Sequence, residues 1–280
     1  MSLHRFGLAY ALLLAACLGS LAAQGDLSLG RAPWDNLTRT LGDFARPSFL
    51  DLWFGPERLE YRSEDGALLR VEDRRAVEAN FLLAVGRGAW VTLQIATLGS
   101  LLAALLALPL ALLAARNLHA PRWAQGAARA VLDATRAVHT LVFGLLLVGI
   151  VGLGPMAGIL AIALHSLGSY GKLFAESIES LDMAAVDAVR ATGASPLQVF
   201  GRAVLPQVAP QFVGHHLYVW EFNIRDSTVL GLIGAGGLGL LITEAVSLFQ
   251  WSRLATLLIV VILMVVSFDA LSRRLREALL

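Results

Sequence analysis

The chain has 280 residues, of which 57% are hydrophobic and 15% are charged, and its formal net charge is +1. A water-soluble domain is usually about half apolar and about a quarter charged, so this composition indicates a membrane protein rather than a soluble enzyme. The small net charge excludes a general attraction for nucleic acid, and a single cysteine, Cys17, excludes a disulfide framework. Lysine occurs once, at Lys172, which we attribute to codon bias.

Long stretches without Asp, Glu, Lys or Arg predict the membrane spans, because about 20 apolar residues cross the core of a bilayer. The stretch 137–171 is too long for one helix. It contains Gly152, Gly154 and Pro155, which predict a turn between two spans. We therefore expect an all-α, polytopic membrane fold with about six spans. They lie at 6–24, 90–115, 132–152, 156–174, 208–230 and 254–272.

The arginine positions predict the orientation, because loops that face the cytoplasm carry an excess of basic residues. Arg116, Arg122 and Arg129 lie between the second and third spans, and three arginines follow the last span. This pattern places both termini, and the segment 176–206, on the cytoplasmic side of a bacterial inner membrane. The segment 26–80 opposes the pattern with eight arginines of its own.

The first span allows three interpretations. A short basic start and an apolar core predict an uncleaved membrane anchor over 1–25. The small residues Ala22 and Ala23 are also typical of a cleaved secretory signal. Residues 14–17, which end in Cys17, fit the cleavage pattern of a bacterial lipoprotein. Because the apolar run continues beyond Cys17, we expect the uncleaved anchor.

Residues 26–80 are expected to form an external or interfacial segment, followed by the main membrane domain over 81–280. Pro33, Pro47 and Pro56 argue against long helices in this segment. Its aromatic residues either seat it among the lipid headgroups or form a small core. These residues are Trp34, Phe44, Phe49, Trp53 and Phe54.

Residues 176–206 predict two short helices at a bend outside the membrane. Alanine-rich helix formers run up to Gly193, which stops a helix. Ser195 is a good N-cap with Pro196 at the first helical position, and Pro206 is expected to end or kink the second helix. Small residues would let another surface approach closely: Ala184, Ala185, Ala188 and Ala191. From the spacing alone, an ordinary amphipathic connector explains the segment equally well.

A charged cluster lies inside the fifth predicted span. Glu221 is about 20 Å from the start of that span at a rise of about 1.5 Å per residue. A charge at this depth costs roughly 2.5–3.5 kcal/mol, so it usually faces a protein interior or a water-filled path. Glu221 and Arg225 are four residues apart and favour an ion pair. The planar guanidinium of Arg225 suits tetrahedral oxyanions, whereas a self-neutralising pair that fixes helix packing is the alternative.

Two motifs resemble those of ABC importer permeases, whose signature is Glu-Ala-Ala, three residues, Gly, and a fixed gap to Leu-Pro. The chain matches it at Asp187-Ala188-Val189, Gly193-Ala194-Ser195, Phe200 and Leu205-Pro206, with Asp187 in place of Glu and Val189 in place of the second Ala. A later stretch is similar to the phosphonate-type permeases: Glu221-x-Asn223-x-Arg225-x-Ser227-Thr228-Val229-x-Gly231, then Gly234-Ala-Gly236-Gly237-Leu-Gly239. The resemblance covers about residues 80–280 and leaves 26–80 without a match.

The resemblance implies a permease domain over 81–280 and a role for each motif. Coupling to an ATPase is implied for Asp187, Ala188, Gly193, Ala194, Ser195, Leu205 and Pro206. The substrate path is implied for Glu221, Asn223, Arg225, Ser227 and Thr228, and a flexible turn for Gly234, Gly236, Gly237 and Gly239. The implied partners are a dimer of cytoplasmic ATPase subunits, a periplasmic or lipid-anchored solute-binding protein and a second permease copy.

We therefore expect the membrane-spanning permease of an ATP-driven importer for phosphonate or a related phosphorus oxyanion: phosphite, hypophosphite or phosphate. The chain has no Walker A motif, so ATP hydrolysis is expected on a separate subunit and the chain is not expected to be an enzyme. One alternative is a permease for another small solute, such as an amino acid. Another is an ion-coupled secondary carrier in which Glu221 and Asp226 are the coupling carboxylates.

Two further patterns do not predict a cofactor. Residues 234–239 match the dinucleotide motif G-x-G-x-x-G, but they lie between apolar helices and without the strand that such a site needs. They favour a turn buried in protein at the edge of the membrane. The neighbours His215 and His216 point to different faces, so we expect no metal or haem. His139 and His165 are expected to be packing or path residues.

Overall fold

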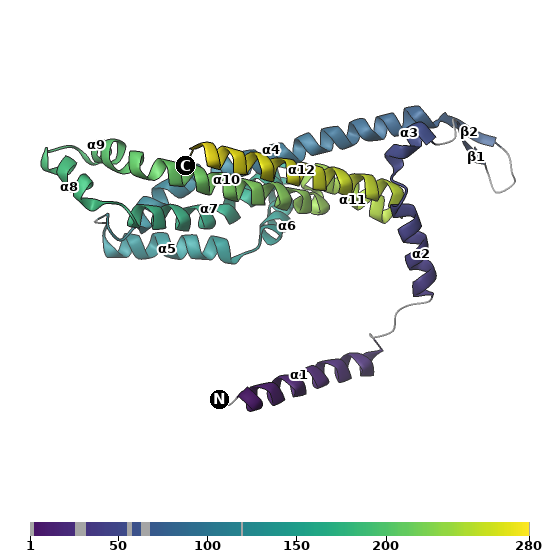
Figure 1. The fold of residues 1–280 in the computed structure, drawn as a ribbon, viewed down its shortest axis with the longest axis horizontal. Coiled ribbons are helices and arrows are strands. Elements are labelled where there is room, and N and C mark those ends of the chain that lie inside the picture. Colours follow the sequence, from purple (N-terminus) through teal and green to yellow (C-terminus); the bar gives the residue numbers. More distant parts are fainter. Residues whose placement is uncertain (1–2, 26–31, 55–57, 63–67, 119, 280) are drawn as a thin grey trace. The chain divides into compact units, whose positions relative to one another are not determined.

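The computed structural model describes residues 3–25, 32–54, 58–62, 68–118 and 120–279 (Figure 1). The chain divides into two compact units, Met1–Ala45 and Arg46–Leu280, which are described separately. The second unit contains the segment 46–80 together with the helices of the predicted membrane domain.

The first unit consists of two helices, α1 (Leu3–Gln24) and α2 (Pro33–Phe44). Residues Gly7–Gln24 are long and apolar enough to cross a membrane, as the predicted anchor requires. Pro33 lies in the first turn of α2, where no backbone donor is lost, so it permits this helix of 12 residues in a segment for which long helices were not expected. Trp34 is exposed and no residue of α2 is buried, which argues against a small core here.

The second unit begins with the short helices η1 (Ser48–Leu50) and α3 (Asp51–Phe54) and a two-stranded antiparallel hairpin. Strand β1 (Arg58–Arg62) pairs with β2 (Leu68–Asp73), with Arg58 opposite Asp73. The Ser48 hydroxyl lies 3.1 Å from that of Thr256 and ties η1 to the last helix. Trp53 and Phe54 are exposed, so they do not form a core either.

Helix α4 (Arg74–Ala114) is longer than predicted. Its 41 residues span about 60 Å at a rise of about 1.5 Å, roughly twice the core of a bilayer. The predicted start at residue 90 is wrong because the Asp73 carboxylate accepts a hydrogen bond from the Arg75 amide and caps the helix earlier. The extra turns carry Glu78, which lies 3.8 Å from Arg253 of the last helix.

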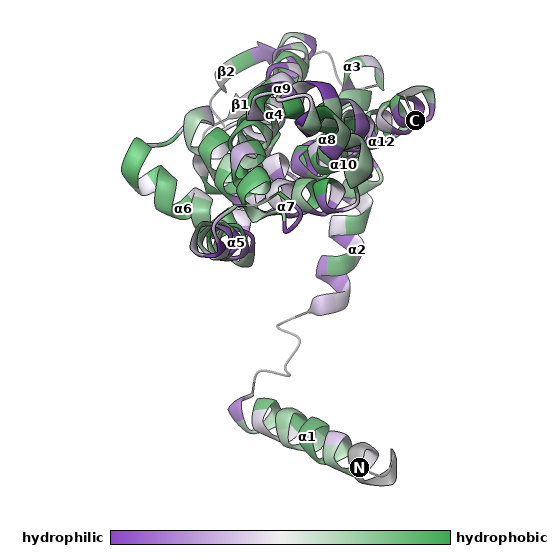
Figure 2. Cartoon of the chain, turned by 90° about the vertical axis from the view of Figure 1, so that its left-hand side faces the viewer, coloured by the Kyte–Doolittle hydropathy of each residue, from purple (hydrophilic) through white to green (hydrophobic). Residues whose placement is uncertain are grey.

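The predicted span 132–152 is not one helix. Helix α5 (Arg122–Ala137) and helix α6 (Thr140–Val151) meet at a bend of 90°. Val138 and His139 are extended there, and His139 Nδ1 accepts a hydrogen bond from the Leu141 amide to start α6. Figure 2 shows the contrast between them, because α6 is almost wholly hydrophobic whereas α5 is largely hydrophilic.

The predicted turn between the spans 132–152 and 156–174 is confirmed. Gly152 and Gly154 adopt φ of 95° and 137°, which glycine tolerates best, and helix α7 (Pro155–Glu179) follows. The remaining elements are α8 (Met183–Ala191), α9 (Pro196–Val199), the π-helical turn η2 (Phe200–Val204), α10 (Leu205–Leu230), the π-helical turn η3 (Gly231–Ala235), α11 (Leu238–Ser247) and α12 (Trp251–Leu279).

The fold is the all-helical membrane fold that the sequence predicts, with one small hairpin added. Among the described residues, three helices are individually long and apolar enough to cross a membrane: α1, α4 and α12. If each of two bent helix pairs counts as one span, the number of spans in this part of the chain rises to five. These pairs are α5 with α6, and the helical stretch 196–235 with α11. Helix α7, which corresponds to the predicted span 156–174, has 25 residues but is not among them.

Glycine and alanine let the central helices approach closely. A Cβ on Gly99 of α4 would lie 2.7 Å from the Ile162 side chain of α7. On the other side of α7, a Cβ on Gly168 would lie 2.3 Å from the Leu132 carbonyl oxygen of α5. These contacts hold α4, α5 and α7 together as one block.

We predict that Gly168→Ala destabilises the protein, because the new methyl group meets backbone atoms of α5 that cannot move independently. Overpacking of this kind typically costs about 1–3 kcal/mol. The thermal unfolding midpoint of the detergent-solubilised protein measures the effect. The control is Gly126→Ala on α5, where nothing lies within 4 Å of the added Cβ. Equal midpoints for the two variants would show that the α5–α7 contact is not tight.

Candidate functional site

The predicted bend in 176–206 is present, with its caps. Asp182 accepts a hydrogen bond from the Ala184 amide at 3.0 Å and starts α8. Gly193 follows that helix with φ of 79°. Ser195 and Gln198 then form a reciprocal capping box at the start of α9, with Pro196 in its first turn. The stop at Gly193 and the N-cap at Ser195 are confirmed, although residues 176–179 belong to α7.

Of the two predicted outcomes at Pro206, an end or a kink of the second helix, the structure rules out the end. The helical backbone continues through this proline into α10, and the π-helical turn η2 precedes it. The Leu205 amide bonds to the Phe200 carbonyl, five residues back. A proline ring clashes with the carbonyl four residues earlier, and a π-helical turn is a common way to accommodate such a conflict. Helix α9 is thereby continuous with α10.

The bend exposes one surface and anchors the other. Figure 1 shows α8 and α9 at one end of the second unit, with β1 and β2 at the other. Val186 and Val199 are buried and hold the two short helices against the bundle. Ala194, one of the predicted coupling residues, is half-buried. The other predicted coupling residues are exposed: Asp187, Ala188, Gly193, Ser195, Leu205 and Pro206. The predicted small residues of α8 are exposed as well: Ala184, Ala185, Ala188 and Ala191.

The predicted Glu221–Arg225 ion pair is present, at 3.6 Å. Glu221 also lies 3.7 Å from Arg276 of α12, a partner far away in sequence that spacing could not reveal. The Glu221 side chain is 18% exposed, whereas that of Arg225 is 54% exposed. Glu221 is therefore shared by two cations, and the guanidinium of Arg225 stays accessible on the surface of the subunit.

The other predicted path residues are buried in helix packing. Asn223 donates to the Ser100 hydroxyl at 2.7 Å and accepts from Ser166 at 3.0 Å, which joins α10 to α4 and α7. Ser227 and Thr228 both donate to the Ile224 carbonyl of their own helix. The structure thus divides the predicted set between two faces of α10. Asp226, the other carboxylate in this stretch, accepts a hydrogen bond from Thr140 at 2.7 Å.

The glycine motif forms a tightly packed corner between α10 and α11, where the helical path bends by 58°. Gly234, Gly236 and Gly237 adopt φ of 97°, 88° and 71°. A Cβ on Gly239 would lie 2.2 Å from the Thr228 carbonyl oxygen. The Leu238 amide donates to Thr92 of α4 at 2.9 Å. Glycine is therefore needed at these positions because the backbone has positive φ or because neighbouring atoms lie too close for a side chain. The flexibility of the turn stays a prediction.

A polar stripe on α7 was not recognised in the sequence. His165, Ser169, Lys172, Glu176 and Glu179 recur at alternating spacings of four and three residues, so they share one face of the helix. The stretch without charged residues, 137–171, ends immediately before Lys172. In the sequence, Lys172 therefore marked only the end of an apolar stretch. The heptad-like spacing of these polar residues is the signal that could have identified the stripe.

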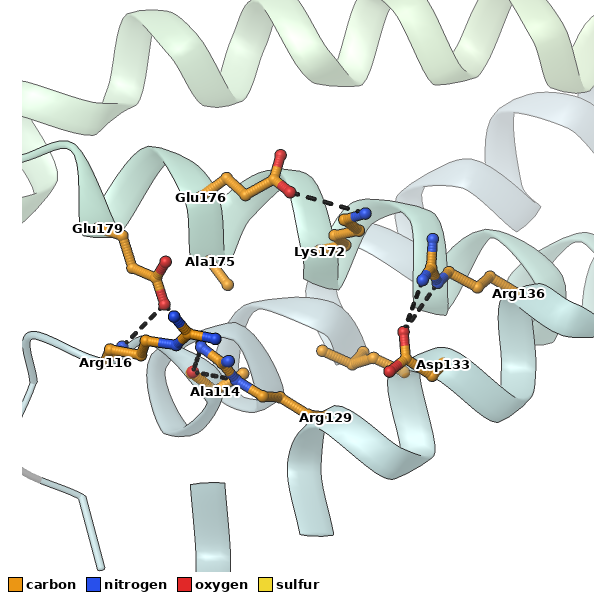
Figure 3. Close-up of a pocket in the computed structure, with 10 residues that line it drawn as sticks. Ala114, Arg116, Arg129, Asp133, Arg136, Lys172, Ala175, Glu176 and Glu179 are labelled. Carbon is orange, nitrogen blue, oxygen red and sulfur yellow. Dashed lines mark hydrogen bonds and ion pairs between the residues drawn. The ribbon is translucent and has the colours of Figure 1, made fainter. Parts of the chain in front are cut away.

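Facing side chains of α5 pair with this stripe or with one another, as Figure 3 shows. Arg129 lies 2.7 Å from Glu179, and the Arg116 amide donates to the same carboxylate at 2.9 Å. Arg136 lies 2.8 Å from Asp133 of its own helix. Within α7, Lys172 lies 3.8 Å from Glu176, a distance too long for a strong hydrogen bond.

Two cavities lie along these helices. The first, of about 320 Å³, is drawn in Figure 3 and is lined by Ala114, Arg116, Arg129, Leu132, Asp133, Arg136, Lys172, Ala175, Glu176 and Glu179. The second, of about 440 Å³, adds α10 and is lined by Arg136, His165, Ser166, Ser169, Lys172, Leu173, Tyr218, Val219, Phe222 and Asn223. Arg136 and Lys172 line both cavities, and no acidic residue is among the ten of the second.

His165, His215 and His216 each have a different hydrogen-bond partner. His165 lies 2.8 Å from the Val138 carbonyl and also lines the second cavity. His215 lies 3.0 Å from Ser177, whereas His216 lies 3.0 Å from the Tyr170 hydroxyl. In the described part of the chain, no group of three or more His, Cys, Asp or Glu could hold a metal ion.

The helical membrane bundle carries an exposed, capped two-helix bend at one end, as the resemblance to the permeases of ABC importers predicts. Residues 107–279 match the family of binding-protein-dependent transport system inner membrane components, and the chain belongs to this family. It is thus a multi-pass inner-membrane transport subunit and not an enzyme. An ATPase and a substrate-binding protein are the partners that this class of importer requires.

Known relatives resemble the chain over about two thirds of its length. The phosphite transport system permease protein PtxC of Stutzerimonas stutzeri is 44% identical over 186 residues, which are 66% of this chain and 68% of PtxC. The phosphate-import permease protein PhnE of Mycolicibacterium smegmatis is 39% identical over 70% of this chain and 37% of its own. The inward-facing MetNI methionine ABC transporter has a similar fold, with a TM-score of 0.63 and 19% identity over 71% of this chain and 97% of that chain.

We predict that Glu221→Gln destabilises the protein, because Arg225 and Arg276 then lack their shared counter-charge. The expected loss is about 1–2 kcal/mol, between the values typical of exposed and of buried ion pairs. The thermal midpoint in detergent measures it. Asp269→Asn is the control, since it removes a pair with the more exposed Arg273 and should cost less. A double variant, Glu221→Gln with Arg276→Gln, should recover part of the loss. If it is no more stable than Glu221→Gln alone, Arg276 is not coupled to Glu221.

Proposed function

We propose that this permease carries phosphite or a related phosphorus oxyanion: phosphonate, hypophosphite or phosphate. The observation that supports this most strongly is the 44% identity to a phosphite permease over 186 residues. The sequence prediction rests on the motif at Glu221, Asn223 and Arg225. Family membership favours an ATP-driven importer over an ion-coupled secondary carrier.

The bend formed by α8 and α9 is the docking segment for the ATPase. Its exposed small residues allow close approach, and its caps keep both short helices formed when they are gripped. Closure of two ATPase subunits on ATP pulls this segment, tilts the helices that continue from it, and switches the path between inward and outward opening. The residues that make the contact are Asp187, Ala188, Gly193, Ala194, Ser195, Leu205 and Pro206.

Arg225 is the substrate-facing residue among those predicted on α10. Its accessible guanidinium can form two parallel hydrogen bonds to an oxyanion, and Glu221 holds it in place from one side. Asn223, Ser227 and Thr228 contribute by packing the helix that presents Arg225. The glycine corner provides a turn at the outer end of this helix.

The assembly comprises two copies of this chain, two ATPase subunits and an external solute-binding protein. Both termini and 176–206 lie in the cytoplasm. Residues 1–25 anchor the chain, 26–80 lie on the external side and 81–280 form the permease domain. The exposed Trp53 and Phe54 of the external segment suit the level of the lipid headgroups.

The proposed function is tested with the complete importer reconstituted in lipid vesicles with ATP inside. We expect uptake of phosphite that requires both ATP and the binding protein and is unaffected by excess methionine. The measurement is phosphite content of the vesicles over time. Uptake that persists without ATP and collapses with the proton gradient would favour the secondary carrier. ATP-dependent uptake of an amino acid, with none of any phosphorus oxyanion, would favour the other permease class.

The docking role predicts a graded effect at Gly193. A side chain at φ of 79° is strained, least for Asn and most for a β-branched residue. Gly193→Val should therefore lower ATPase co-purification and uptake by about tenfold, at a cost of about 1–2 kcal/mol in backbone strain. Gly193→Asn should keep most of both. Normal association and uptake in the Val variant would remove the bend from the coupling contact.

A further inference from the structure

The charges of the two cavities are distributed unevenly. The first cavity holds four basic and three acidic side chains, and in Figure 3 each of the three acidic ones pairs with a basic one. The second cavity keeps the two basic residues that both cavities share, Arg136 and Lys172, without an acidic residue among the ten that line it. Its remaining polar residues are His165, Ser169 and Tyr218, together with Ser166 and Asn223, which bond to one another. Hydroxyl donors beside two cations are the chemistry that binds an oxyanion.

This face of the bundle cannot lie against lipid. Lys172 and Glu176 are both about half-exposed in the isolated subunit, and a charge in contact with lipid tails is strongly unfavourable. The stripe from His165 to Glu179 therefore borders water or another protein surface. Lys172 lies seven residues before Glu179, and Arg136 lies seven residues after Arg129, so both are about 10 Å from the end of the bundle that carries α8.

Helix α10 connects this site to Arg225. Tyr218 and Phe222 line the second cavity, and Arg225 lies on the same face, three residues beyond Phe222. An anion that leaves Arg225 thus meets Arg136 and Lys172 next along the bundle. The Arg116 and Arg129 side chains line the first cavity beyond them.

We infer that Arg136 and Lys172 form a second anion-binding site, at which a tetrahedral phosphorus oxyanion rests between Arg225 and the α8 end of the bundle. The inference rests on the proposed function and assigns it a site. Asp133 and Glu176 are the resting counter-ions of the two cations and compete with the anion for them. This competition keeps binding weak enough for release, which transport through a series of sites requires.

The single lysine of the chain suits this position. An ammonium is a compact, strongly hydrated charge, whereas a guanidinium holds an oxyanion through two fixed hydrogen bonds. A lysine attracts the anion without clamping it. The other 21 basic residues of the chain are arginine. Lys172 is assigned to the anion site because of its position beside the second cavity, and not because lysine is rare in the chain.

The test measures initial rates of ATP-dependent phosphite uptake in vesicles that hold the complete importer. Lys172→Gln and Arg136→Gln should each raise the KM for phosphite by about tenfold, the effect of losing a hydrogen bond to a charged group. Lys172→Arg keeps the charge and should not raise KM, whereas its guanidinium holds the anion longer and should lower the maximal rate. The control is Arg273→Gln, which breaks an ion pair of the same four-residue spacing on α12 and should leave KM unchanged.

A second variant separates a binding role from a structural one. Glu176→Gln removes the competitor of Lys172, so it should lower KM and also lower the maximal rate, because release slows. Loss of a purely structural ion pair would not lower KM. The amount of each variant in the membrane and its ATPase association are measured in parallel.

The outcomes separate this site from the proposed function. If the wild type transports phosphite and the two Gln variants behave like Arg273→Gln, the site is overturned and the function stands. A KM for Glu176→Gln at or above that of the wild type also overturns the site. A wild-type importer that moves no phosphorus oxyanion overturns both.

Discussion

A charge within a membrane must be paired or must face water, and this constraint governs every polar group of the bundle. Glu221 satisfies it by lying between Arg225 and Arg276, and Asp226 by accepting a hydrogen bond from Thr140. Asn223 satisfies it with one partner on each of two neighbouring helices. Lys172 and Glu176 in the stripe on α7 are different, since both are half-exposed and only loosely paired. Their position therefore marks a face that lipid does not cover.

The same constraint explains why small residues dominate the contacts between helices. Apolar side chains gain little from burial against one another when the alternative is lipid, so close packing provides the stability. Gly168 and Gly171 bring α7 against Leu132 of α5, and Gly99 of α4 lets that helix pack against Ile162 of α7. The three helices form a block that holds the polar stripe and its α5 partners in fixed register.

The sequence predicted most of the fold where a local signal decided it. The caps at Ser195 and Pro196, the turn at Gly152 and Gly154, and the positions of α7, α10 and α12 follow from patterns within a few residues. The early start of α4 was missed because a search for apolar stretches finds the residues in the membrane core. It does not find the polar residues through which the same helix continues beyond that core. The bend before α6 was missed because an apolar stretch carries no mark of a change in direction.

The site was predictable only in part, for a related reason. Spacing within α10 revealed the pair of Glu221 and Arg225, whereas Arg276 joins them only through the packing of α12. The paired roles of Lys172 and Arg136 depend on α5 lying beside α7, which no single helix encodes. Charged residues near the end of a predicted span are easily assigned to its boundary. A repeating spacing distinguishes a polar face from a boundary.

Continuity between α9 and α10 joins the proposed docking segment to the proposed path. Residues 196–235 remain helical through Pro206 because the π-helical turn absorbs the conflict with the proline ring, so a displacement at α9 is passed along one rod. That rod supplies Tyr218, Phe222 and Asn223 to the second cavity, whereas Arg136 and Lys172 belong to the block of α5 and α7. A tilt of α10 therefore changes the shape of the cavity while the basic pair stays in place. Since Asn223 joins the rod to both α4 and α7 through hydrogen bonds about halfway along the bundle, it lies where such a tilt would pivot.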